Sequence, residues 1–160
     1  MKKTVWIVVF ALVASVVGLV LVTSSGAIVR EEKLTYVMQP IDETGIDING
    51  DHELTPGDGW VSNNALRRDG EVVGNLVSSC QFIKVRADGM GGLLQCVSTA
   101  KIPGGQITAQ TRFPLIEGQT NAPDAAITGG TGAYANARGY VSSEPIQGTP
   151  KVLITFYLIP

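Results

Sequence analysis

Gly129-Gly130-Thr131-Gly132-Ala133-Tyr134-Ala135-Asn136-Ala137-Arg138-Gly139 is the segment of this sequence that is most informative about its fold. Glycine adopts positive φ values and lets two backbones approach closely, as a tight crossing between two barrel strands requires. In such a crossing Tyr134 can plug the end of the barrel and Arg138 can hold the turn. A structural role explains every residue of the stretch, which therefore identifies a fold rather than an activity.

On both sides of this stretch, short runs of β-forming residues alternate with Gly, Pro and Asp clusters. After the N-terminal segment no stretch has a sustained apolar repeat of 3.6 residues, so we expect no further helix. The expected strands cover residues 34–39, 59–66, 71–86, 92–101, 105–113, 123–128, 138–145 and 151–159. Short strands at regular spacing with turn signals between them predict an all-β sandwich or barrel.

Two of these strands show which side chains share a face. Residues 105–113 alternate between polar even positions and mostly apolar odd positions, the odd face ending in Thr111 and Phe113. In residues 151–159 both faces are largely apolar, as in a barrel wall covered by a neighbour or a second subunit.

The N-terminal segment is an expected export signal. Residues 5–22 carry no charge, and 18 residues of helix span about 27 Å, close to the thickness of a bilayer core. Lys2 and Lys3 favour a cytoplasmic N-terminus, and small residues up to Ala27 offer a cleavage site. We leave open a signal peptide over residues 1–27 and an uncleaved anchor; a buried core helix is the third interpretation.

Localisation and domain organisation follow from that segment. The protein is expected at the outer face of a bacterial cytoplasmic membrane, or secreted after cleavage near Ala27. Residues 28–58 are interpreted as a linker with the first strand and an acidic loop, and residues 59–160 as a β-barrel domain whose barrel starts near residue 34.

The composition excludes several classes of function. Twelve Lys and Arg against 14 Asp and Glu give a net charge of −2, so we expect no nucleic-acid partner. Asp47, Asn49 and Asp51 have the alternate spacing of a Ca²⁺ loop, but His52 stands where an EF-hand needs Gly. We interpret residues 42–58 as a solvated acidic loop and predict no metal site. A hydrolase interpretation would rest on His52 alone, and we set it aside.

The two cysteines flank a turn-rich centre at residues 87–92. If the strands on either side form a hairpin about residue 88, Cys80 and Cys96 lie opposite each other and can bridge. An exported domain sits where disulfides persist. We favour a structural disulfide over two free thiols.

The glycine-rich stretch resembles the G-G-T-G-x-[FY]-x-x-A-R-G signature of the allene oxide cyclase and dirigent barrel superfamily. The matching residues are Gly129, Gly130, Thr131, Gly132, Tyr134, Arg138 and Gly139. Residues 57–60 and 69–74 look like the second strand, turn and third strand of that superfamily. Residues 91–94 and 105–109 are similar to bacterial members that cyclise spirotetronate- and spirotetramate-type polyketides.

What the resemblance implies is an eight-stranded antiparallel β-barrel, here preceded by an N-terminal hydrophobic helix, with the ligand inside and no cofactor. The implied activity is the intramolecular cyclisation of a small, apolar, polyketide-like substrate, as in a [4+2] cycloaddition. Two alternatives stay open: a non-catalytic exported barrel that binds a small apolar ligand, and a dirigent-like protein that steers radical coupling. Plant members imply a homodimer or a homotrimer, and residues 5–22 imply membrane contact if uncleaved.

Within that barrel we predict the side chains of the lumen from the alternation. If the disulfide faces outward, odd positions face inward on both of its strands. Gln81 and Gln95 are then the expected catalytic hydrogen-bond donors to a substrate carbonyl. The expected substrate-binding residues are Asn63, Ser79, Thr99, Thr111, Phe113, Ser143 and Tyr157.

Overall fold

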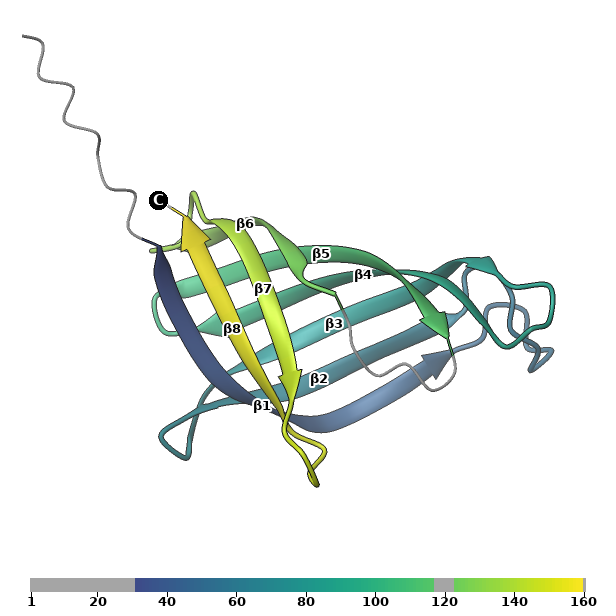
Figure 1. The fold of residues 1–160 in the computed structure, drawn as a ribbon, viewed down its shortest axis with the longest axis horizontal. Helices are drawn as coiled ribbons and strands as arrows, with labels where there is room; N and C mark the ends of the chain where they lie inside the picture. The colour runs from purple at the N-terminus through teal and green to yellow at the C-terminus, as the bar shows by residue number, and fades with distance from the viewer. Residues whose placement is uncertain (1–30, 117–122, 160) are drawn as a thin grey trace, which may run out of the picture.

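A computed structural model describes residues 31–116 and 123–159, which form a closed barrel (Figure 1). Its strands are β1 (Glu32–Ile46), β2 (Gly59–Arg68), β3 (Glu71–Val85), β4 (Gly91–Ile102), β5 (Gly105–Ile116), β6 (Ala125–Gly132), β7 (Arg138–Pro145) and β8 (Val152–Ile159). Each strand is antiparallel to the next, and β1 pairs with β8 to close the wall. The predicted eight-stranded antiparallel barrel is confirmed.

The expected N-terminal helix over residues 5–22 lies outside the described residues. Within residues 31–116 and 123–159, no helix is long and apolar enough to cross a membrane.

Strand β1 is much longer than the predicted strand over residues 34–39. Its first half pairs with β8 and its second half with β2, so that one strand seals the barrel (Figure 1). The register shifts between Pro40 and Asp42, which makes Ile41 an extra, exposed residue of a β-bulge. As a consequence Asp42 and Glu43 belong to the barrel wall and not to the acidic loop that the sequence suggested.

The glycine-rich stretch forms the end of β6, a tight turn and the start of β7. Gly132 has a φ of +63°, and a Cβ at this position would overlap the carbonyl oxygen of Gly104. The Tyr134 hydroxyl donates a hydrogen bond of 2.9 Å to the carbonyl oxygen of Pro103 and so ties this turn to the turn between β4 and β5. Arg138 is exposed, and in the described part of the chain no hydrogen bond or ion pair joins its side chain to the turn.

Apolar side chains fill the barrel at the end where β1 begins. Phe156, Leu66 and Ile107 are fully buried there, and the ring of Tyr36 packs edge-on against Phe156 at 6.1 Å. A second, smaller cluster around Phe82 and Leu94 lies toward the other end. Between these two clusters the barrel is hollow, and this hollow part is where a ligand could bind.

Candidate functional site

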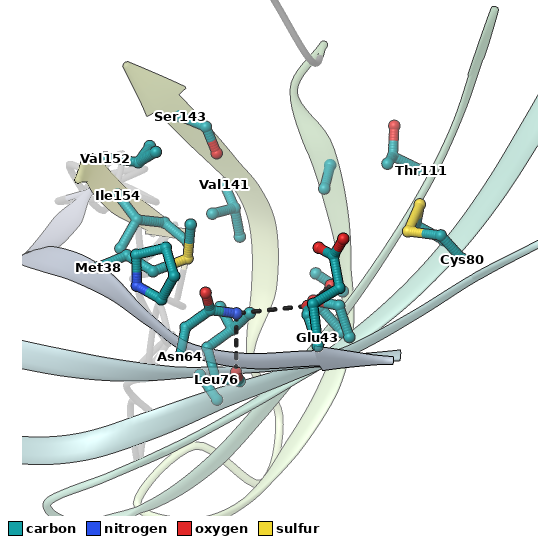
Figure 2. A pocket seen from close by; sticks show the side chains of 18 of the residues that line it. Met38, Glu43, Asn64, Leu76, Cys80, Thr111, Val141, Ser143, Val152 and Ile154 are labelled. Atoms are coloured by element: carbon teal, nitrogen blue, oxygen red, sulfur yellow. Dashed lines mark hydrogen bonds between the residues drawn. A yellow bond between two sulfur atoms is a disulfide. The ribbon is translucent and has the colours of Figure 1, made fainter. Parts of the chain in front are cut away.

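The hollow part of the barrel is a cavity of about 400 Å³ to which all eight strands contribute side chains (Figure 2). Most of the wall is apolar, including Leu76, Ala100, Ala109, Val141 and Ile154. A cavity of this size and composition suits one small, largely apolar ligand, as is usual for eight-stranded barrels.

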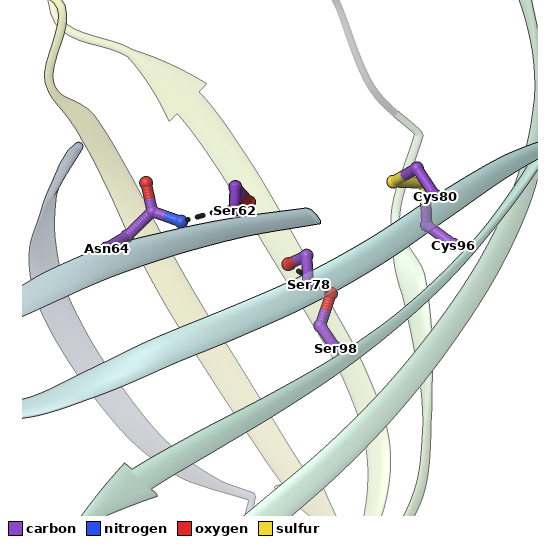
Figure 3. Close-up of a disulfide and its surroundings, with 6 residues drawn as sticks. All are labelled: Ser62, Asn64, Ser78, Cys80, Cys96 and Ser98. Carbon is purple, nitrogen blue, oxygen red and sulfur yellow. Dashed lines mark hydrogen bonds between the residues drawn. A yellow bond between two sulfur atoms is a disulfide. The ribbon is translucent and has the colours of Figure 1, made fainter. Parts of the chain in front are cut away.

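One wall of the cavity carries a row of polar residues, which we call the polar belt: Glu43, Ser62, Ser78 and Ser98. These four are successive cross-strand partners on β1, β2, β3 and β4. The hydroxyls of Ser78 and Ser98 are 2.8 Å apart and share a hydrogen bond (Figure 3). The belt therefore places hydroxyl groups and one carboxylate at a single level of a largely apolar cavity.

Asn64 lies one row deeper than the polar belt and is only 7% exposed. Its side-chain nitrogen donates to the carbonyl oxygen of Leu76 at 3.3 Å (Figure 2) and to the hydroxyl of Ser62 at 3.4 Å (Figure 3). Both contacts hold the amide in one orientation, which directs its oxygen toward the lumen (Figure 2).

The row on the other side of the belt contains Trp60, Cys80, Cys96 and Thr111. Cys80 and Cys96 form the predicted disulfide, with their Cα atoms 4.1 Å apart. Both half-cystines are 5% exposed and line the cavity, so the bridge is part of the inner wall (Figure 3). The expectation that this disulfide lies outside the barrel is wrong.

That reversed orientation corrects much of the predicted site. Thr111, Phe113 and Ser143 line the cavity as expected, and their contact with a substrate stays a prediction. The expected catalytic pair, Gln81 and Gln95, is exposed and faces away from the lumen. Four other predicted residues also lie outside the cavity lining: Asn63, Ser79, Thr99 and Tyr157.

These errors share one physical reason: successive side chains of a strand point to opposite faces, so an error of one residue exchanges the inner and outer faces of the whole strand. The apolar even positions of β3 and β4, such as Leu76, Phe82 and Leu94, are the signal that could have fixed the faces correctly. Glu43 carried no such signal, because the bulge at Ile41 reverses the faces of β1 beyond it. Tyr157 is taken up on the outer surface, where its ring stacks on that of Tyr140 at 4.4 Å.

The acidic segment uses its carboxylates to hold its own backbone. Asp47 accepts hydrogen bonds from the backbone N–H groups of Asn49, Gly50 and His52, and those bonds lower the pKa of its carboxyl group. Asp58 is 5% exposed and accepts from the N–H of Ile48.

Thr55 donates to Asp58 through both its N–H and its hydroxyl, and the contacts with Ile48 and Thr55 lower the pKa of Asp58. The described residues contain no group of three or more His, Cys, Asp or Glu side chains arranged for a metal ion. His52 is not among the residues that line the cavity.

Comparisons with known proteins agree with this geometry. Residues 40–158 match the family described as the allene oxide cyclase barrel like domain. No curated protein sequence matches the chain significantly.

Among solved structures, a pyocyanin demethylase is 28% identical with a TM-score of 0.66, covering 79% of this chain and 99% of its own. AbnU, an exo-specific intermolecular Diels-Alderase, is 13% identical with a TM-score of 0.61, covering 81% and 98%. The pterocarpan synthase dirigent protein PsPTS1 is 21% identical with a TM-score of 0.58, covering 81% and 95%. The last two share the fold with this chain.

Proposed function

Since the chain belongs to the allene oxide cyclase barrel-like family, we propose that it holds one small, largely apolar substrate in its cavity and closes a ring within that substrate. The observation that carries the proposal is the cavity itself, which has a volume of about 400 Å³, largely apolar walls and the hydroxyl groups of the polar belt. The reaction we favour is an intramolecular [4+2] cycloaddition of a linear, polyketide-type polyene.

This chemistry asks little of the protein in proton transfer. Two σ bonds form, three π bonds become one, and no atom enters or leaves. Apolar walls that fold the chain until diene and dienophile meet can supply a large part of the roughly 7–11 kcal/mol available from proximity and orientation. No cofactor is needed in this proposal.

The polar belt supplies the second contribution. Ser78 and Ser98 share one hydrogen bond, which leaves one of the two hydroxyl protons free to donate to a substrate carbonyl. A hydrogen bond to that carbonyl polarises the dienophile and stabilises the charge that develops in the transition state. In this proposal the serines take the role that the sequence assigned to Gln81 and Gln95.

The experiment is a comparison of metabolites from the native host with and without this gene. The compound that accumulates in the deletion strain is incubated with the purified protein and followed by liquid chromatography with mass spectrometry. We expect a product of unchanged mass and shifted retention time without any added cofactor. A compound that persists unchanged rejects the cyclase and favours the non-catalytic binding barrel.

A second candidate is hydrolytic demethylation of a small aromatic compound, in which water replaces the methyl group with hydrogen and carries the methyl group away as methanol. It is favoured by the 28% identity to pyocyanin demethylase over nearly the whole of that chain, and by the carboxylate of Glu43 at the cavity wall. The same mass spectrum separates the two reactions, because a demethylated product is lighter by one CH₂ unit. Product formation that depends on an added oxidant would instead indicate a dirigent-like steering protein.

We also propose the setting in which the barrel works. The protein acts outside the cytoplasmic membrane, attached through residues 5–22 or released after cleavage near Ala27, and it assembles into a homodimer or a homotrimer. The uncharged segment and its basic start support the first statement, and exposed valines on the outer barrel wall support the second.

A further inference from the structure

The charged side chains that line the cavity are all of one sign. In the described part of the chain they are Asp42 and Glu43, and the lining contains no Lys, Arg or His. Glu43 pairs with Ser62, whose side chain is on the inner face, whereas Asp42 pairs with Asn63, which lies on the outer face. Both acidic residues are exposed to solvent, and it is the side chain of Glu43 that Figure 2 shows extending toward the lumen.

The β-bulge is what brings this carboxylate inside. Before the bulge, the even-numbered residues Met38 and Pro40 line the cavity. In a strand without a bulge the even-numbered residues would continue to face inward, and Glu43 would face outward. Ile41 is an extra residue, 59% exposed, that opposes no residue of β2. Beyond it the faces are exchanged and Glu43 takes the inner position.

Asn64 provides an independent observation at the same place. Its side chain is more than nine-tenths buried, and its nitrogen is engaged by Leu76 and Ser62. Its side-chain oxygen accepts no hydrogen bond from any described residue. Among the described residues, every fully buried side-chain oxygen or nitrogen has a hydrogen-bond partner, so this oxygen is not fully buried. The oxygen is therefore open to the cavity that Asn64 lines, and Figure 2 shows it on the side of Met38, away from the two hydrogen-bond partners of the nitrogen.

We propose that the cavity selects a ligand with a positively charged nitrogen, such as a protonated or quaternised nitrogen on an otherwise apolar body. Glu43 offsets the charge, and Asn64 accepts a hydrogen bond from an N–H group of the ligand or attracts its positive end. An anion of the same shape is disfavoured, because its charge would be placed beside the exposed carboxylate of Glu43, which repels it. This inference rests on the proposed function in that it names the substrate class for the same cavity.

The test uses three planar fluorescent probes of one shape: aminoacridine as the cation, anthracenemethanol as the neutral compound and anthracenecarboxylate as the anion. Each is titrated into the purified full-length protein at neutral pH. We expect the cation to bind about tenfold or more tightly than the anion. Glu43→Gln should reduce this ratio about tenfold while the neutral probe binds as before.

Two control variants test whether the charge selectivity arises in the cavity. Glu53→Gln removes the same charge from the exposed acidic segment and should leave the ratio unchanged. Ala109→Leu reduces the space in the cavity and should weaken the binding of all three probes. Equal binding of cation and anion, an unchanged ratio in Glu43→Gln, or no binding of any probe overturns the inference. Charge selection without turnover of any accumulated compound would instead reject the cyclase and leave this inference standing.

Discussion

Asn63 and Asn64 are consecutive residues of one type on opposite faces of β2, so they provide a matched pair of variants. Asn64→Ala removes a group that lines the cavity, together with the two hydrogen bonds that its nitrogen donates. We expect it to lower the conversion rate and to cost about 1 kcal/mol in the free energy of unfolding.

Asn63→Ala removes one contact with Asn75 on the outer wall and should change neither quantity by much. Rates by chromatography and stabilities by urea unfolding check both variants. Equal losses of rate in the two would contradict the assignment of the inner face.

The turn between β6 and β7 allows a similar comparison of glycines. Gly132→Ala forces a Cβ against the carbonyl oxygen of Gly104 at a positive φ, whereas a Cβ on Gly45 has nothing within 4 Å. We expect Gly132→Ala to cost more than about 2 kcal/mol and Gly45→Ala less than about 0.5 kcal/mol. Thermal unfolding measures both, and similar melting temperatures would count against the close crossing.

For individual residues, the sequence predicted which residues form the disulfide and the glycine turn better than it predicted which face of the barrel wall a side chain occupies. The cysteine pair was predictable because the two residues are spaced symmetrically about the hairpin turn. The glycine turn was predictable because positive φ values favour glycine. The lumen position predicted for Gln81 and Gln95 was wrong, because polarity alone does not distinguish a glutamine that faces the lumen from one on the outer wall. Because the disulfide lies on the inner side of the wall, the odd-numbered residues Gln81 and Gln95 lie on the outer side.

Among the elements, the β3–β4 hairpin is held by the disulfide between Cys80 and Cys96, which are 16 residues apart. Closing a loop of this length stabilises the folded state by roughly 3 kcal/mol in the chain-entropy model. The double variant Cys80→Ala/Cys96→Ala should lose about that much in urea unfolding. A reducing agent should destabilise the wild type by a similar amount and leave the double variant unaffected; sensitivity of the double variant would refute this account.

The segment between β1 and β2 should make stability depend on pH. Hydrogen bonds from Ile48 and Thr55 lower the pKa of Asp58 in the folded state, so this carboxylate stabilises the fold above the ordinary pKa of aspartate, near 4. Its contribution disappears as the pH falls through the lowered folded pKa.

Asp58→Asn should therefore be less stable at pH 7 and lose less stability than the wild type on acidification below about pH 4. Glu53→Gln is the control, and urea unfolding at several pH values is the measurement. Parallel stability curves for Asp58→Asn and the wild type would contradict this role.

Strand positions were predictable to within a few residues, except in β1. Its expected end at residue 39 stopped short of the bulge, because Pro40, Asp42 and Glu43 are residues that strands disfavour. Pairing with β2 overrides that preference and places these residues in the wall. A bulge has no reliable sequence signal, so the position of Glu43 could be found only from the register.

For the whole molecule, the outer wall predicts assembly. Val61, Val77 and Val97 are 39–45% exposed on adjacent strands β2, β3 and β4. We expect Val77→Lys to shift the mass measured by light scattering toward the monomer, because a second copy would have to bury the added charge. Val72→Lys, at the start of β3, is the control, and a monomeric wild type would contradict the prediction.

In the proposed reaction the substrate is converted inside the barrel. Ala109 faces the cavity, whereas Ala126, on the neighbouring strand β6, is exposed on the outer wall. The most direct test is therefore the conversion rate of the accumulated compound with Ala109→Leu and with Ala126→Leu. We expect Ala109→Leu to lose most of the conversion while staying folded and Ala126→Leu to retain it; equal conversion by the two variants would contradict a reaction inside the barrel.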